Sequence, residues 1–185
     1  MTLGPDDLLP GEVVRVSKNA NALVGVAEAG LTRFRHDRLL GTVGMRGKEG
    51  IGGRLHVTDY RIVFDAHAAN RLTGRFSVFL PVVTGVRDVS RRLSKQLEIS
   101  TGTGRFTFVV WGVPSLLATI ERLRGAASTQ VAWLAQTATA EPAKVGAGLA
   151  PRPSQGHNPD LAPADLVGAT GLTELRDLAD RLRGE

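Results

Sequence analysis

The sequence predicts a mainly β protein: an antiparallel barrel or sandwich of about seven short strands, capped by one C-terminal amphipathic helix. Stretches of alternating apolar and polar residues recur over residues 12–111, with turn-forming residues between them. A helical pattern follows immediately, and a Pro/Gly-rich tail comes after it. The chain is 42% hydrophobic and 22% charged, values that allow a buried core.

The first strands are read from alternation. Val14 and Val16 alternate with polar residues, and Asn19 and Asn21 predict a turn after them. A weaker strand is expected at 23–27. A clearer one is expected at 31–36, where Arg33 and Arg35 point to one side.

The stretch 41–53 is rich in glycine and is read as a mobile connection. It does not match a nucleotide-binding loop, because Gly47-Lys48 is followed by glutamate where Ser or Thr is required. The clearest hairpin in the chain comes next, over 54–64, with Asp59 and Tyr60 at its corner.

Further strands are predicted at 76–80, 82–89, 97–101 and 106–111. Phe108 and Trp111 are expected in the core, where the last strand meets the helix. The basic cluster Arg91, Arg92 and Lys95 lies between two of these strands. It is read as a solvated loop or a contact for acidic partners.

The helix begins near Pro114 and has one apolar face, formed by Leu116, Leu117, Ile120 and Leu123. The sequence leaves open whether Gly125 ends it or whether it extends over 126–139. A Pro/Gly/Ala linker is expected over 140–163 and a short amphipathic helix over 164–185.

Three segments together resemble GRAM domains, which are PH-like and related to GLUE domains. They are "LLPGE" (8–12), "GGRLHVTDYRIVF" (52–64) and "LEISTGTGRFTFVVWG" (97–112). The resemblance covers residues 8–125 and implies a PH-like barrel that binds a protein or an anionic lipid. Arg61 matches the family's hairpin signature and is expected to have a structural role.

The resemblance also implies an anionic-ligand site. PH domains that bind phosphoinositides often carry a lysine and then a basic-x-Arg pair on the next strand, and Lys18 with Arg33 and Arg35 is similar to that pattern. Guanidinium groups on one strand face suit a phosphate, although a solvated strand face is the simpler reading. The predicted site adds three basic residues nearby: Arg38, Arg46 and Lys48.

Composition argues against catalysis and cofactors. The chain has no cysteine, and its four histidines are scattered without metal-ligand spacing. No catalytic triad or pair of carboxylates emerges, so the sequence predicts a binding module without a cofactor or metal. Residues 1–139 carry 18 basic and 11 acidic residues, and residues 140–185 carry 5 and 7, so the net charge of +5 comes entirely from the first part.

The expected partner is a protein or an anionic phospholipid. Expected contacts for a protein partner are Trp133, Leu175, Leu178 and Leu182. A self-assembling module without lipid affinity is the alternative, and a nucleic-acid binder is a more distant one. With no signal peptide or membrane-spanning run in this sequence, a cytoplasmic protein is expected, with the inner membrane surface left open. The preference for arginine over lysine is typical of GC-rich bacterial genomes.

Overall fold

The computed structural model describes residues 3–25, 48–70, 72–151 and 171–184. Its eight strands form one sheet with every pairing antiparallel, in the order β5-β6-β7-β1-β2-β3-β4-β8. The strands are β1 (Val14–Gly25), β2 (Lys48–Thr58), β3 (Arg61–Ala66), β4 (Leu72–Phe79), β5 (Gly85–Asp88), β6 (Gln96–Ser100), β7 (Arg105–Val110) and β8 (Gly148–Pro151).

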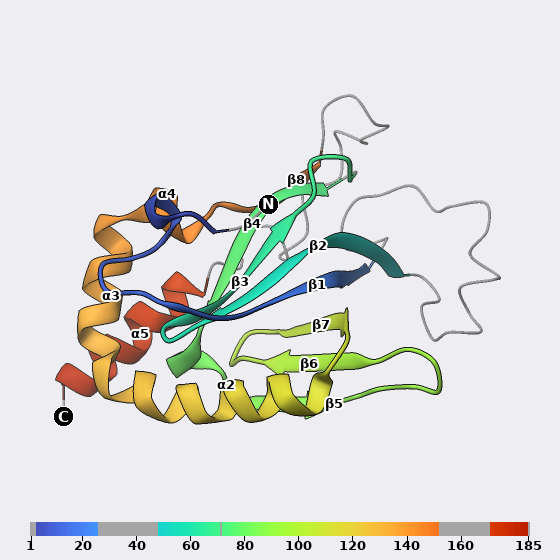
Figure 1. The fold of residues 1–185 in the computed structure, drawn as a ribbon. Coiled ribbons are helices and arrows are strands. Elements are labelled where there is room, and N and C mark those ends of the chain that lie inside the picture. The colour runs from blue at the N-terminus through green and yellow to red at the C-terminus, as the bar shows by residue number, and fades with distance from the viewer. Residues whose placement is uncertain (1–2, 26–47, 71, 152–170, 185) are drawn as a thin grey trace.

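The helices follow β7, except for two short 3-10 turns. The helical elements are η1 (Pro5–Asp7), η3 (Leu80–Val82), α2 (Val113–Ala127), η4 (Ser128–Gln130), α3 (Val131–Ala140), α4 (Pro142–Val145) and α5 (Leu172–Arg183). Figure 1 shows α2 running along the β5–β7 side of the sheet, with α3 and α5 at its far end.

The predicted fold class is confirmed. The chain is mainly β, and seven antiparallel strands precede the helix α2, as expected of a PH-like domain. Because β5 and β8 stand at opposite ends of the strand order, the sheet is open and not a closed barrel. The sequence left open where the helix after β7 ends. In the structure α2 ends at Ala127, and the 3-10 turn η4 joins it to α3.

Four phenylalanine rings fill the middle of the core. The ring of Phe76 lies 5.6 Å from Phe64 and 5.5 Å from Phe106, and Phe64 lies 5.6 Å from Phe108. These separations suit aromatic packing. Gly53 makes room for this cluster, since a Cβ there would come within 2.5 Å of both the Phe64 ring and a backbone oxygen.

The predicted turn at Asn19 and Asn21 is wrong. These residues lie inside β1, which pairs with β2 along its length and with β7 at 20–23. Ala20 and Ala22 point into the core while both asparagines point outward, so the segment has the two-residue period of a strand. The strand β2 begins at Lys48, so the glycine-rich connection predicted over 41–53 contains the start of a strand.

A buried ion pair fastens the β2–β3 corner. Arg61 donates from Nε and Nη2 to Glu12, at 2.8 Å and 3.0 Å, and both side chains are fully buried. Thr58 Oγ1 also donates to Glu12, and Arg61 reaches the backbone oxygens of Asp7 and Lys144. The structural role expected for Arg61 is thus confirmed.

The first part of the predicted linker is structured. Residues 142–151 contain α4 and β8, and β8 pairs with β4 at the edge of the sheet. Ser77 Oγ donates to the backbone oxygen of Val145, and Leu149 is fully buried. The prolines and glycines of this stretch predict a linker. The sequence does not show that β4 has an unpaired edge to which residues 148–151 can add a strand.

Candidate functional site

The loop between β5 and β6 presents an exposed leucine among cations. Arg91 and Ser94 exchange two backbone hydrogen bonds, of 2.8 Å and 2.7 Å, and so close a tight turn. Arg92 takes a positive φ of 40°, a conformation that costs energy for a residue with a side chain. This turn holds Leu93 outward with 88% of its surface exposed.

Trp111 stands beside this loop and is also exposed, over 75% of its surface. Its predicted place in the core is wrong. Phe106, Phe108 and Val110 fill alternate positions of β7 and point inward, so the side chain of residue 111 must point outward. Gly112 then takes a left-handed conformation and starts α2.

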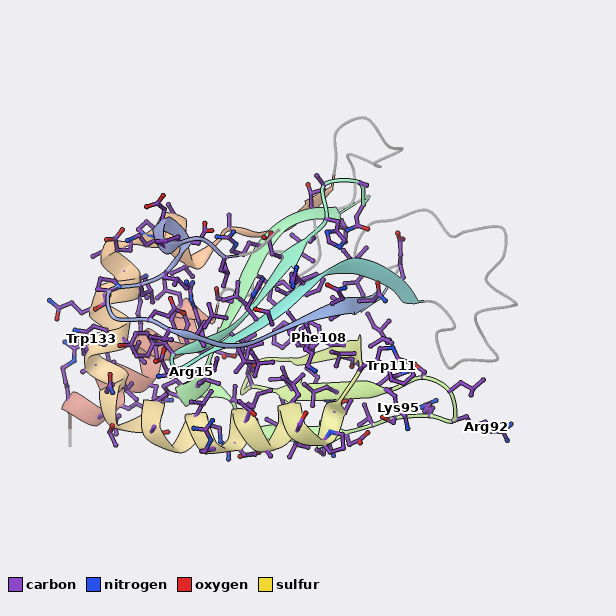
Figure 2. All side chains as sticks on the ribbon, viewed as in Figure 1. Arg15, Arg92, Lys95, Phe108, Trp111 and Trp133 are labelled. Atoms are coloured by element: carbon purple, nitrogen blue, oxygen red, sulfur yellow. The ribbon has the colours of Figure 1, made fainter. Side chains whose placement is uncertain are left out.

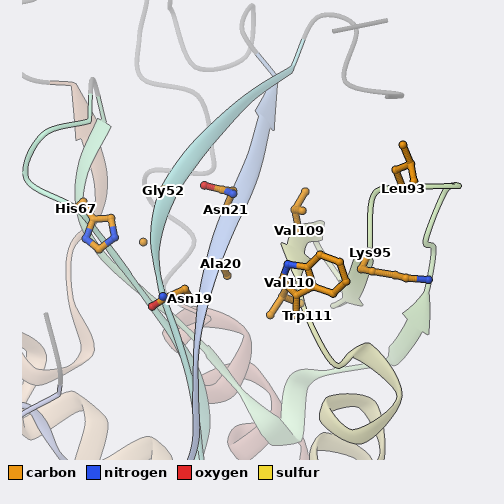
Figure 3. Close-up of a pocket in the computed structure, with 11 residues that line it drawn as sticks. Asn19, Ala20, Asn21, Gly52, His67, Leu93, Lys95, Val109, Val110 and Trp111 are labelled. Atoms are coloured by element: carbon orange, nitrogen blue, oxygen red, sulfur yellow. The ribbon is translucent and has the colours of Figure 1, made fainter. Parts of the chain in front are cut away.

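Trp111 and the loop form one wall of an open hollow of about 370 Å³. Figure 3 shows Trp111, Lys95 and Leu93 on one side of this hollow and Asn19, Asn21 and His67 on the other. The remaining lining residues are Ala20, Gly52, Gly53, Val109 and Val110. The hollow therefore combines apolar surface, two amides and an ammonium group.

Four cations surround this wall: Lys18, Arg91, Arg92 and Lys95. The last three are exposed, and Lys18 Nζ lies against Gly112, where a Cβ would be 3.4 Å from it. Within the described part of the chain, none of the four has a carboxylate within 4 Å. We call Leu93, Trp111 and these four cations the basic tip.

The structure describes only part of the predicted anionic-ligand site. Lys18 lies on β1 and belongs to the basic tip. Arg33, Arg35, Arg38 and Arg46 lie outside the described residues, as does the side chain of Lys48. Alternation in the sequence had singled out Arg33 and Arg35. The sequence shows the basic tip only as the charge cluster 91–95, because it does not show that Leu93 and Trp111 line the same hollow.

The predicted partner contacts divide into two pairs. Leu175 is fully buried and Leu178 partly buried against this chain's own core, so neither side chain is freely presented to a partner. Leu182 is 51% exposed and Trp133 is 40% exposed, and the Trp133 ring meets Tyr60 edge-on at 5.3 Å. Figure 2 shows Trp133 and Trp111 at opposite ends of the molecule.

Among the described residues, no three His, Asp or Glu side chains are grouped closely enough to hold a metal ion. Within the same residues, no helix is long and apolar enough to cross a membrane.

No family model matches the chain. No curated protein matches it either. Among solved structures, it is similar to the C-terminal domain of an unknown protein from Leishmania infantum, with 12% identity and a TM-score of 0.44 over 62% of this chain and 86% of that one. It is also similar to the Vps36 N-terminal PH domain, with 18% identity and a TM-score of 0.43 over 66% of this chain and 86% of that one.

Proposed function

We propose that this chain is a non-catalytic, GRAM-like binding module that docks on an anionic membrane surface through its basic tip. The observation that carries the proposal is Leu93, which is 88% exposed in a loop that also carries Arg91, Arg92 and Lys95, and which lines the same hollow as the exposed Trp111. An apolar side chain ringed by cations suits the boundary between lipid head groups and acyl chains.

The magnitudes support this mode of docking. Each basic residue near an anionic bilayer contributes roughly 1 kcal/mol, so the four cations alone give about 4 kcal/mol, which is roughly millimolar binding. Burying Leu93 and Trp111 adds about 2 kcal/mol for each side chain. Charge and insertion together reach roughly micromolar affinity, whereas neither suffices alone.

The arginines of the predicted ligand site can add to the same surface. Arg33, Arg35, Arg38, Arg46 and Lys48 remain proposed contacts for lipid phosphates, alongside Lys18. The exposed pair Trp133 and Leu182 remains a proposed contact for a protein partner. Trp133 supports this, because an exposed tryptophan is a common anchor at protein interfaces.

Co-sedimentation with vesicles tests the proposal. We expect the full chain to pellet with phosphatidylserine-containing vesicles, to stay in solution with pure phosphatidylcholine, and to lose binding as salt rises. Leu93→Asp should weaken vesicle binding about tenfold or more, because a carboxylate replaces the inserting group. Trp133→Ala is the matched control at the far end and should bind like the wild type.

The variants also separate the two proposed sites. Loss of binding in Arg33→Ala/Arg35→Ala, with Leu93→Asp unaffected, would assign the membrane contact to Arg33 and Arg35 and reject the basic tip. Absence of anionic-vesicle binding by the wild type at low salt would reject the membrane proposal altogether. A protein partner would then be sought at Trp133.

A further inference from the structure

The C-terminal helix α5 rests on the rest of the chain through a narrow set of contacts. It lies against α3, η3 and the end of β4. Leu175 and Ala179, four residues apart, are its only fully buried side chains, and Leu172 and Leu178 are partly buried beside them. Ala135 and Ala138 of α3 are small and buried, which lets a second helix approach closely.

The carboxylate of Glu174, in the first turn of α5, joins this helix to the turn between β6 and β7. Glu174 accepts hydrogen bonds from Thr101 Oγ1 at 3.0 Å, from the Thr103 backbone N–H at 2.9 Å, and from the Thr103 hydroxyl. These donors belong to the turn between β6 and β7. A further bond joins Arg176 Nε to Thr139 Oγ1 at 2.9 Å, on α3. The surface under α5 is therefore apolar in the middle, with hydrogen-bond donors at one end that hold Glu174.

No short loop holds α5 in this position. Residues 152–170 separate it from β8, whereas a strand and the helix that follows it are usually joined by about two to six residues. The twelve residues of α5 are also too few for a stable isolated helix in water. Its helical structure therefore depends on the surface that it covers.

We propose that α3, η3 and β4 form a helix-binding groove, and that α5 is its detachable occupant in cis. The groove accepts an amphipathic helix with a leucine and an alanine four residues apart and a glutamate just before the leucine. When α5 leaves, the apolar floor becomes available to a helix of that pattern. This device is separate from the basic tip and does not depend on membrane binding.

Titration of a labelled peptide spanning residues 171–185 into the full chain tests the proposal. Leu175→Asp opens the groove without altering its floor, since Leu175 lies on α5. We expect the peptide to bind this variant and to gain helical circular dichroism, and to bind the wild type at least about tenfold more weakly, because α5 competes at high effective concentration. Leu182→Asp, the same change at an exposed leucine of α5, should behave like the wild type.

Equal binding to the wild type and to Leu175→Asp, or binding to neither chain while both remain folded, overturns the proposal. If Leu175→Asp fails to fold, hydrogen exchange on the wild type decides. A detachable α5 exchanges its amides by local opening, far faster than β2 and β3. Exchange of α5 only together with those strands would show that it is an integral part of the core.

Discussion

At the scale of single residues, His56 is the group most sensitive to pH. It is fully buried on β2, and its Nδ1 shares a hydrogen bond of 2.7 Å with Ser17 Oγ. Burial is the main cause that lowers the pKa of His56 to about 4; Asp65 opposes this shift, and Arg54 and Arg75 add to it. The imidazole is therefore neutral in the folded protein at pH 7.

The unfolded chain takes up a proton at His56 near pH 6.5, while the folded chain resists protonation until about pH 4. We therefore expect His56 to remove stability as pH falls from 6.5 to 4, by up to about 3 kcal/mol. Urea unfolding of the wild type and of His56→Gln should show a shallower loss in the variant over this window. His67→Gln, at an exposed position, should keep the wild-type slope. Parallel curves for the wild type and His56→Gln would contradict the assignment.

The Glu12–Arg61 pair is the second critical feature at this scale. Removing one member leaves a buried charge without its partner, so we expect Glu12→Ala or Arg61→Ala to lower the free energy of unfolding by about 3–5 kcal/mol. The pair Arg15–Asp59, with Arg15 side chain 47% exposed, provides the control: Arg15→Ala should cost less than about 1 kcal/mol. If Arg61→Ala and Arg15→Ala lower the free energy of unfolding equally, burial of the ion pair does not set the cost of removing one member.

At the scale of elements, the C-terminal segment completes the sheet. Beyond residue 141, the chain supplies the carbonyls that Arg61 and Ser77 use, adds β8 to the edge of β4, and brings α5. We expect a chain ending at residue 139 to have a free energy of unfolding several kcal/mol below that of the full chain, because buried donors lose their acceptors. Its urea midpoint should fall accordingly. Unchanged midpoints would mean that residues 1–139 fold without the C-terminal segment.

The sequence predicts elements well where the two-residue period is strong. The hairpin over 54–64 and the strand ending at Val110 follow from alternation alone. Prediction failed where a local signal opposed the tertiary setting: Asn19 and Asn21 are turn formers that β2 and β7 hold in a strand. Likewise β8 has no strand pattern of its own and forms because β4 offers an edge.

The candidate site was harder to predict than the fold. The alternation that buries Phe106, Phe108 and Val110 also predicts that the side chain of Trp111 points outward. The closeness of Trp111 to Leu93 depends on the β6–β7 pairing and on the tight turn at Arg91–Ser94, which are long-range and conformational facts. Charge clusters are visible in a sequence, but the apolar residues that give a cluster its specificity are not.

At the scale of the whole molecule, the two exposed tryptophans mark its two ends (Figure 2). Docking through the basic tip would turn the Trp133 end away from the bilayer, where a protein partner can reach it. The chain has two tryptophans, so Trp133→Phe leaves Trp111 as the sole reporter of insertion. We expect its fluorescence to be quenched by brominated anionic lipids if the proposed orientation holds.

The contacts of Arg61 also bear on how the protein is made. This side chain binds the backbone oxygen of Lys144, which is synthesised 83 residues later. At about 5–20 residues per second, a ribosome needs roughly 4 to 17 seconds to cover that distance. During this time β3 to β7 are synthesised, and the guanidinium of Arg61 lacks one of its acceptors throughout. The buried hydrogen bonds of Arg61 are therefore complete only after residue 144 has been synthesised.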